Sequence, residues 1–451
     1  MTDEPPITEA ASRHEPNGQG GPPAIVIVGA GAAGAVAAYR LRQLMGPGAS
    51  ITILEGSPRI GGRARHVNFG GSTVEVGASI LHSAGRRLLD LADTLGVALE
   101  PAGGGGPGGL GVWTGDGFSF QAAPGAVEAE LLARYGPESV LGMVSAARDV
   151  AAAWSEIYAL QDKETLFDDP GALLRAIGLE RLVPVSLADQ LTAAGVGRPL
   201  IDGFVTGALR NIYNQTPDIN GLAGSIALVG AGLAGGELLA VRDGNSELYA
   251  KLIAAADARL LRGNLVTGVH QAAHRTVVST SHGGEFPADA VVVAAAPELA
   301  RVRFDPAVHL DRRAFQEVHV TLVAGEVSAG YFASATVPGA ILTENRAGLA
   351  FKSLGYVTES PRFRAPIWKF FSAARLDRSD IAPIFSSIHR TWRTSWEAYP
   401  VLVPRTSLPP FERAPGIFII GSMESAVSTM EHEAVAAWNV AGLVHRRLAE
   451  G

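Results

Sequence analysis

The stretch AIVIVGAGAAG at residues 24–34 constrains the fold of this chain more than any other. A run of branched apolar residues leads directly into Gly29, Gly31 and Gly34, and small helix-forming residues follow. Such a strand–turn–helix unit lets the backbone approach a pyrophosphate at the helix N-terminus. A second apolar run, SITILE, ends in Glu55, where a carboxylate can accept hydrogen bonds from a ribose. The sequence therefore predicts a Rossmann-like unit that binds a dinucleotide through these three glycines and Glu55.

A second stretch, ALVGAGLAG at residues 227–235, repeats the glycine spacing. Asp243, Gly244 and Asn245 follow it closely and would break a helix. An acidic residue, Asp257, falls at about the right distance, but it sits within SELYAKLIAAADARLL, whose apolar spacing is helical. We therefore predict that 227–235 is a close-packed, glycine-rich connection with no nucleotide of its own.

Composition excludes several functions. A formal net charge of -7, without runs of Lys or Arg, argues against a nucleic-acid partner. The absence of cysteine excludes disulfides, thiolate metal sites, a cysteine nucleophile and a cysteinyl link to a cofactor. No His/Glu spacing indicates a metal site. The most apolar stretches, 24–41 and 222–241, are rich in glycine and fit a buried core better than an integral membrane segment.

The first 23 residues are acidic and rich in Pro and Gly, and they lack the basic start and apolar stretch of a signal peptide. We expect a disordered leader over 1–23 and a cytoplasmic protein. The run GGGGPGG at 103–109 can hold no regular element, so a surface loop is expected there.

The residues after Glu55, GSPRIGGRARH, contain a second glycine pair and an arginine. Gly61 and Gly62 would allow close backbone approach, and Arg63 would neutralise a phosphate oxygen. An extended flavin dinucleotide needs such a segment, whereas a nicotinamide-only enzyme has no evident use for it. Here the sequence resembles the flavoprotein superfamily of glutathione-reductase type, and within it the amine-oxidase-like branch. The resemblance implies FAD as the cofactor.

A more specific resemblance covers most of the chain from residue 24 onward. The segments, in order, are EVGASILHS (75–83), SLADQLTAAGV (186–196), ALRNIYNQ (208–215), SIALVGA (225–231), DGN (243–245), SWEAYP (395–400), RTSLPPFE (405–412) and MESAVSTMEHEAVAAWNVA (423–441). Together they look like the prenylcysteine oxidase family. The chain departs from the animal enzymes of that family in lacking a secretory signal.

The order of these segments predicts an α/β chain with two discontinuous domains. A Rossmann-like FAD-binding domain of glutathione-reductase type is expected over 24–115, 240–300 and 410–451, and a discontinuous α+β substrate-binding domain over 116–239 and 301–409. Further FAD contacts are expected from the backbone at Gly77, Ala78 and Ser79, which in relatives runs past the flavin, and at Val266, against the adenine.

The C-terminal segment is expected to meet the flavin again. GIFIIGSME is predicted to be a buried strand that ends at Gly421, with Glu424 just beyond it in the position that contacts the ribityl or phosphate region in relatives. A helix follows, capped by Ser428 or Thr429, with Glu431 as the capping-box partner of Ser428. The positive end of this helix would stabilise the reduced flavin.

Candidates for catalysis are few. His82 follows the stretch expected beside the flavin, and Glu431 competes between a catalytic role and capping. Tyr213, with Arg210 and Gln215, matches family positions in the substrate-binding part, although Arg210 fits a structural ion pair equally well. His432 is expected to be structural.

The resemblance implies a reaction in which FAD takes a hydride from the carbon next to sulfur. Water then adds, the adduct collapses to an aldehyde and a thiol, and O2 reoxidises the flavin to give hydrogen peroxide. The implied partners are a small apolar thioether and O2. Two alternatives stay open: an amine-oxidase-like desaturase or tailoring oxidase of bacterial small-molecule biosynthesis, which the Ala-, Gly- and Arg-rich composition favours, and a flavin-binding protein without turnover.

Overall fold

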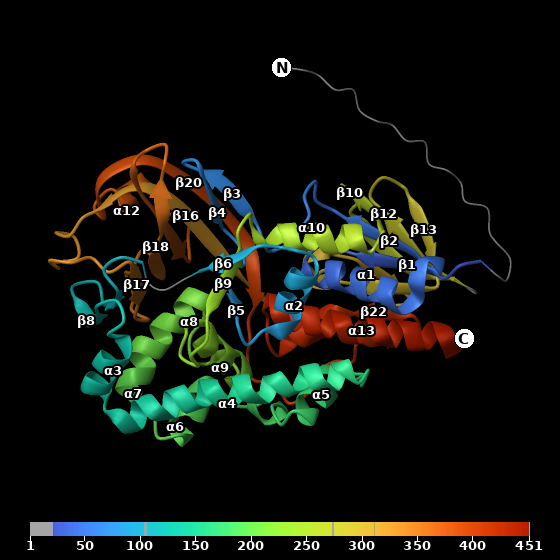
Figure 1. The fold of residues 1–451 in the computed structure, drawn as a ribbon, viewed down its shortest axis with the longest axis horizontal. Helices are drawn as coiled ribbons and strands as arrows, with labels where there is room; N and C mark the ends of the chain where they lie inside the picture. The colour runs from blue at the N-terminus through green and yellow to red at the C-terminus, as the bar shows by residue number, and fades with distance from the viewer. Residues whose placement is uncertain (1–20, 103–105, 273–274, 311, 451) are drawn as a thin grey trace, which may run out of the picture.

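The computed structural model describes residues 21–102, 106–272, 275–310 and 312–450, so most of the predicted leader lies outside the described residues. Its first layer is a six-stranded sheet (Figure 1). In spatial order the strands are β10 (Arg259–Arg262), β2 (Ser50–Glu55), β1 (Ala24–Val28), β14 (Ala290–Val293), β22 (Ile417–Ile419) and β21 (Glu412–Ala414). All neighbours pair in parallel except β21, which is antiparallel to β22. The predicted α/β fold is thus confirmed, and four separated parts of the chain build this sheet.

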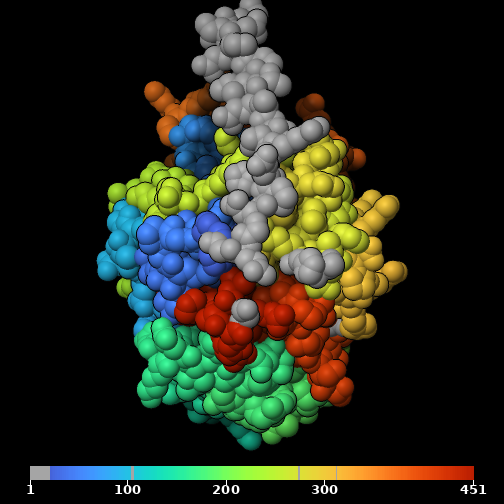
Figure 2. Space-filling model, turned by 90° about the vertical axis from the view of Figure 1, so that its right-hand side faces the viewer, coloured from blue at the N-terminus to red at the C-terminus, as the bar shows by residue number. Residues whose placement is uncertain are grey.

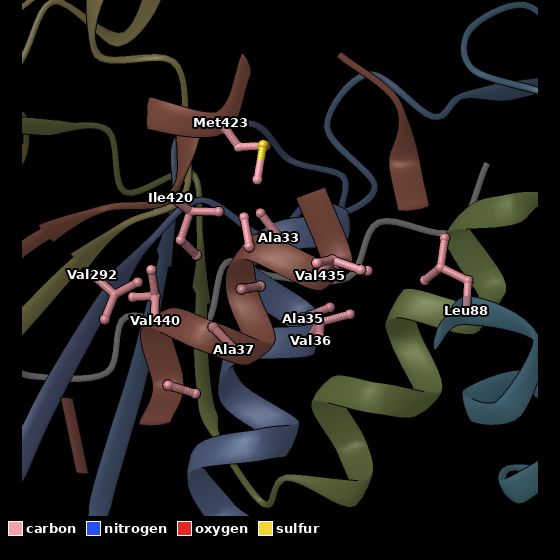
Figure 3. Close-up of a cluster of buried hydrophobic side chains, with 14 of the residues drawn as sticks. Ala33, Ala35, Val36, Ala37, Leu88, Val292, Ile420, Met423, Val435 and Val440 are labelled. Carbon is pink, nitrogen blue, oxygen red and sulfur yellow. The ribbon is translucent and has the colours of Figure 1, made fainter. Parts of the chain in front are cut away.

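Three helices pack together on this sheet: α1 (Ala32–Met45), α10 (Asn245–Ala255) and α13 (Met430–Glu450). Residues 33–38 of α1 are all buried, because the helix lies between the sheet and α13. Figure 3 shows the alanines of α1 beside Val435 and Val440 of α13. Small side chains let the two helix backbones approach closely, and the apolar surface removed from water stabilises the contact.

Smaller sheets surround this layer. One contains β13 (Glu285–Ala288), β12 (Thr276–Thr280), β11 (Val266–Gln271) and β15 (Arg303–Asp305); another contains β5 (Leu81–His82), β9 (Leu238–Val241) and β6 (Leu99–Pro101); β3 (His66–Phe69) pairs with β4 (Ser72–Glu75). Val266, which the sequence analysis expects against the adenine, is the first residue of β11.

A second large sheet has seven strands. Its order is β20 (Phe385–Pro400), β16 (Phe315–Val327), β19 (Ala365–Ser372), β18 (Ser353–Ser360), β17 (Ala340–Thr343), β7 (Leu110–Trp113) and β8 (Phe118–Ala122). The strand β7 lies on the N-terminal side of the predicted domain boundary at residue 115, yet it pairs with β8 and β17 in this sheet.

Helices form the remaining layer. They are α3 (Val127–Tyr135), α4 (Pro137–Asp162), α5 (Pro170–Ala176), α6 (Leu187–Ala193), α7 (Arg198–Leu200), α8 (Thr206–Ile212) and α9 (Gly221–Gly230), while α2 (Arg86–Thr94), α11 (Pro297–Ala300) and α12 (Arg378–Ile381) lie elsewhere. Figure 2 shows the red C-terminal helix exposed between the blue and yellow Rossmann layer and the green helices. Within the described part of the chain, none of the helices combines the length and apolar character needed to cross a membrane.

The repeated glycine motif is buried only over residues 227–229, so the prediction of a close-packed connection is wrong for residues 230–235. That the motif holds no nucleotide of its own stays a prediction. Its first residues are the last turn of α9, and an exposed turn follows. Gly232 and Gly235 have positive φ angles, and a Cβ on either would meet nothing within 4 Å. The motif therefore ends a helix, in contrast to the strand–turn–helix at Gly29.

The helix predicted around Asp257 is shorter than its apolar spacing suggested. The helix α10 ends at Ala255, and Arg259–Arg262 pairs in parallel with β2. These residues form an edge strand despite their helical apolar spacing, because pairing with β2 gives their backbone a ladder of hydrogen bonds.

Gly34 controls how closely α1 approaches β1. A Cβ on Gly34 would lie 2.0 Å from the Gly29 carbonyl oxygen, which is backbone and cannot swing away. We expect Gly34→Ala to lower the free energy of unfolding by about 1–3 kcal/mol, the usual range for overpacking. Denaturant unfolding measures this, with Gly48→Ala as the control, because a Cβ on Gly48 would meet nothing within 4 Å. Equal stability of the two variants would contradict the close contact.

Candidate cofactor and substrate site

The glycine turn before α1 has the geometry of an anion-binding helix start. The N-cap is Gly31, which has no side chain to cap the first turn, and no acidic residue lies in that turn. The backbone N–H groups at such a start carry partial positive charge. Glu55 adjoins the turn: one carboxylate oxygen accepts from the Ala30 N–H and the other from the Ser57 N–H, each at 2.8 Å. Turn and carboxylate are therefore held as one unit.

The second glycine pair packs against this turn. The Gly61 N–H donates to the Ala30 carbonyl at 2.9 Å. A Cβ on Gly62 would lie 3.3 Å from the Gly31 Cα. Gly61 and Gly62 both have positive φ, which favours glycine. The two glycine segments singled out in the sequence thus lie side by side.

Gly77 and Ala78 follow β4 and run along the same loop. The Ala78 N–H donates to the Arg63 carbonyl at 3.0 Å, and a Cβ on Gly77 would lie 2.0 Å from that oxygen. Only glycine fits at position 77 without a backbone shift. Ser79 comes next in the chain, and Val266 begins β11 as a buried residue.

Glu424 is the centre of a buried ion network. Its carboxylate pairs with Arg63 and accepts a hydrogen bond from the Ser428 hydroxyl at 2.7 Å. It also lies 3.6 Å from a guanidinium nitrogen of Arg313. Arg313 in turn pairs with Glu298 at 2.6 Å. Burial alone would raise the pKa of Glu424, but the guanidiniums of Arg63 and Arg313 outweigh it and hold the pKa below its ordinary value.

The network also holds the end of the last strand of the Rossmann sheet. Gly421 follows β22, and its carbonyl accepts a hydrogen bond from Arg313 at 2.9 Å. The predicted strand therefore ends near Gly421, as expected, and a short 3-10 turn carries the chain on to Glu424.

Glu433 adjoins this network and was missed by the sequence reasoning. It is buried, and one of its oxygens has no hydrogen-bond partner among the described residues. Burial, and then the charge of Glu424, raise the pKa of Glu433 to about 8, so it is protonated at neutral pH. An acid in a first helical turn is ordinarily explained by the helix dipole, so the sequence carried no signal of its burial.

Glu431 does not form the predicted capping box with Ser428. Its two oxygens instead accept hydrogen bonds from the Arg87 and Leu88 N–H groups, at 2.8 and 3.0 Å, and from the Tyr158 hydroxyl at 2.6 Å. Glu431 thus caps α2, a helix distant in sequence. The prediction was wrong because capping-box reasoning considers only local partners, whereas the fold brings the start of α2 to this carboxylate.

The N-terminal end of α13 is capped by Thr429. The His432 N–H donates to the Thr429 hydroxyl at 3.2 Å, and the His432 ring packs against Trp154 at a tilt of 36°, with centroids 3.9 Å apart. Burial lowers the pKa of His432 to about 3, so the ring is neutral. This agrees with the structural role expected for His432.

His82 is held by backbone on both ring nitrogens. Its Nδ1 accepts from the Ala84 N–H at 3.0 Å, and its Nε2 donates to the Gly235 carbonyl at 2.9 Å. Burial lowers the pKa of His82, which keeps the ring neutral near pH 7. These contacts join β5 to the glycine turn after α9.

Tyr213 lies at the end of α8 and is buried against Tyr399, with the two rings perpendicular and their centroids 5.1 Å apart. Gln215 fixes the same region: its amide donates to the Pro400 carbonyl at 3.0 Å and accepts from the Leu402 N–H at 2.9 Å. Burial raises the pKa of Tyr399 to about 12, while the charge of Arg63 opposes the rise. Tyr399 therefore packs on Tyr213 and also lies within electrostatic reach of Arg63 in the ion network.

Two family models match the chain. That of prenylcysteine lyase matches residues 127–451, and that of NAD(P)-binding Rossmann-like domains matches residues 27–95. The chain belongs to the prenylcysteine lyase family. The resemblance noted in the sequence is therefore confirmed.

Members of the prenylcysteine lyase family align over nearly the whole chain. Prenylcysteine oxidase 1 of Bos taurus is 28% identical, covering 94% of this chain and 89% of its own length. Farnesylcysteine lyase of Arabidopsis thaliana is 27% identical with the same coverage. Among solved structures, cyclohexylamine oxidase from Brevibacterium oxydans superposes with a TM-score of 0.67 at 16% identity, over 95% of this chain and 99% of that one. This structural likeness shows the shared fold.

The residues at the glycine turn fit a dinucleotide. The first turn of α1 has no side-chain cap, and the backbone around it is free of side chains at Gly29, Gly31, Gly61 and Gly62. Direct contacts of FAD with the residues named from the sequence, including Glu424 and Thr429, remain predictions. In the described part of the chain, no cluster of His, Asp and Glu side chains could hold a metal ion.

The capping of α2 by Glu431 predicts a stability effect. Glu431→Ala leaves two helix-start N–H groups and the Tyr158 hydroxyl without their acceptor, so we expect a loss of about 1.5–3 kcal/mol of unfolding free energy. Chemical denaturation is the measurement, with Glu156→Ala as the control on the exposed face of α4. A loss no larger than that of the control would show that the cap contributes little.

The raised pKa of Glu433 predicts a pH dependence. The folded pKa of about 8 lies above the ordinary value of 4.5, so folding retains a proton between these values and the wild type loses stability as pH rises through this window. Glutamine cannot ionise, so Glu433→Gln should gain stability relative to the wild type between about pH 5 and 8. Melting temperatures across this range test the sign, and a constant difference would contradict it.

Proposed function

We propose that this protein is an FAD-dependent oxidase that cleaves the C–S bond of a prenylcysteine-like thioether. The observation that carries the proposal is the uncapped glycine turn joined to Glu55, in a chain of the prenylcysteine lyase family. The names of the relatives, prenylcysteine oxidase and farnesylcysteine lyase, support the substrate class.

Bound FAD would supply the chemistry, accepting a hydride from the carbon next to sulfur and passing the electrons to O2 to give hydrogen peroxide. The first turn of α1 would hold the pyrophosphate, and Glu55 the ribose. An ion pair links partly exposed Arg63 in the glycine loop to buried Glu424 in the turn before α13. Few side chains are then required beyond those that orient the substrate and exclude water.

The packed rings of Tyr213 and Tyr399, called the tyrosine wall below, are suited to orienting an apolar substrate. Both rings lie in apolar surroundings that include Leu209, Ile212 and Leu402. We assign Tyr213 to substrate positioning. The assignment of His82 and Glu431 to catalysis is less well supported, because both side chains are already engaged in hydrogen bonds to backbone N–H or carbonyl groups.

The proposal also covers the source organism, the cellular compartment and the binding partners of the enzyme. The Ala-, Gly- and Arg-rich composition supports a bacterial source, and the absence of cysteine is compatible with the cytoplasm. A net charge of -7 gives no support to a nucleic-acid partner. The substrate is then a small apolar thioether, with O2 as the electron acceptor.

The reaction is tested by adding S-farnesylcysteine to the FAD-loaded protein in air. We expect hydrogen peroxide, farnesal and cysteine in equal amounts, because C–S cleavage follows loss of the hydride. Cyclohexylamine serves as the matched amine substrate, and we expect no peroxide from it. Peroxide from the amine alone would favour the amine-oxidase-like alternative, and no reduction of bound flavin by either compound would favour a flavin-binding protein without turnover.

A further inference from the structure

Two cations in the predicted substrate-binding domain, residues 116–239 and 301–409, have no acidic partner among the described residues. Arg210 lies on α8 and is buried, with 8% of its surface exposed, and Lys352 directly precedes β18 and is half-buried. No ion pair joins either side chain to a carboxylate among the described residues. The structural ion pair considered for Arg210 from the sequence is therefore not formed within this part of the chain.

The two side chains are held in one place by a short hydrogen-bond chain. The Arg210 guanidinium donates to the Thr343 hydroxyl at 3.1 and 3.2 Å, and that hydroxyl donates to the Lys352 carbonyl at 2.7 Å. The Lys352 ammonium donates to the Asn214 carbonyl at 2.7 Å. Arg210 lies in the last turn of α8 and Asn214 lies two residues beyond its end, so hydrogen bonds tie Lys352 to this region from two sides.

Keeping two like charges together in a half-buried place is unfavourable unless an anion joins them. Burial, and then the nearby charge of Arg210, lower the pKa of Lys352 to about 8. Neutral acceptors satisfy one ammonium hydrogen and part of the guanidinium, but they do not balance the charge. An Arg fork beside a Lys is suited to a carboxylate, which can accept from both.

A series of contacts leads from Arg210 and Lys352, called the cation pair below, to the glycine loop of the expected cofactor site. Asn214, which holds Lys352, directly follows Tyr213, and Tyr213 packs on Tyr399. Tyr399 in turn lies within electrostatic reach of Arg63 in the glycine loop. A substrate whose charged end reached the cation pair would place its apolar part along the tyrosine wall.

We propose that Arg210 and Lys352 bind the α-carboxylate of the amino-acid part of the substrate. The inference rests on the proposed function and narrows the substrate class: a thioether of a free amino acid is preferred to an esterified or decarboxylated one. Arg210 and Lys352 are binding residues here and take no part in the chemical step.

Kinetics with three thioethers test the site: S-farnesylcysteine, its methyl ester and S-farnesylcysteamine, which lacks the carboxyl. For the wild type we expect the KM of the free acid to be at least tenfold below the other two, with similar kcat. Lys352→Met should raise the KM of the acid at least fivefold and leave the other two within twofold. Arg210→Met provides a second test if Lys352→Met is poorly folded.

Arg346→Gln is the matched control, because Arg346 lies in the same loop but pairs with Glu344 at 2.8 Å. It should change none of the three KM values. Equal KM values for acid and ester in the wild type, or a rise for all three compounds in Lys352→Met, would overturn the carboxylate site while leaving the proposed function intact.

Thermal unfolding of the FAD-loaded protein with each compound separates the two proposals. If none of the compounds is oxidised, the proposed function fails, yet the acid should still raise the melting temperature of the wild type more than the ester does, and Lys352→Met should remove the difference. No difference between acid and ester in the wild type would overturn the site independently of turnover.

Discussion

The ion pair between Arg63 and the buried carboxylate of Glu424 connects an N-terminal and a C-terminal segment of the chain, and the arrangement of the site depends on it. Arg63 belongs to the loop that packs on the first glycine turn, and Glu424 precedes the last helix. A buried charge is strongly unfavourable without its partner, so the pair forms only when both segments are in place. The α1–α13 packing shown in Figure 3 brings them together and buries the apolar surface that stabilises this arrangement.

The turn before α13 and the first turn of α13 carry acids in three different electrostatic settings. Glu424 is ionised because two arginines face it, and Glu431 accepts hydrogen bonds from the start of α2. Glu433 has an oxygen without a hydrogen-bond partner in the described part of the chain, and it keeps its proton. Since these residues lie within ten positions of one another, their differences come from what packs against each, and not from the local sequence.

The predicted substrate-binding domain differs from the start of α13, because two of its positive charges have no carboxylate partner among the described residues. Arg210 and Lys352 are held by neutral oxygens of Thr343, Asn345 and Asn214. Tyr213 packs on Tyr399, and the charge of Arg63 acts on Tyr399, so the apolar tyrosine pair adjoins the ion network. A ligand with a charged end and an apolar body matches this distribution, which agrees with the family to which the chain belongs.

The sequence alone determined the Rossmann unit, the sheet strands near it and the family, because glycine spacing, apolar runs and Glu55 are local signals with direct mechanical meaning. It also singled out Arg63 and Glu424 as candidate cofactor contacts and Tyr213 as a candidate residue of the substrate site. Only the tertiary structure decided that Arg63 faces Glu424, that Glu431 caps α2 and that ALVGAGLAG ends a helix. It also leaves Arg210 without an acidic partner among the described residues. These outcomes depend on residues tens to hundreds of positions apart, whose packing sets burial, pKa and charge balance, and no local pattern encodes such neighbours.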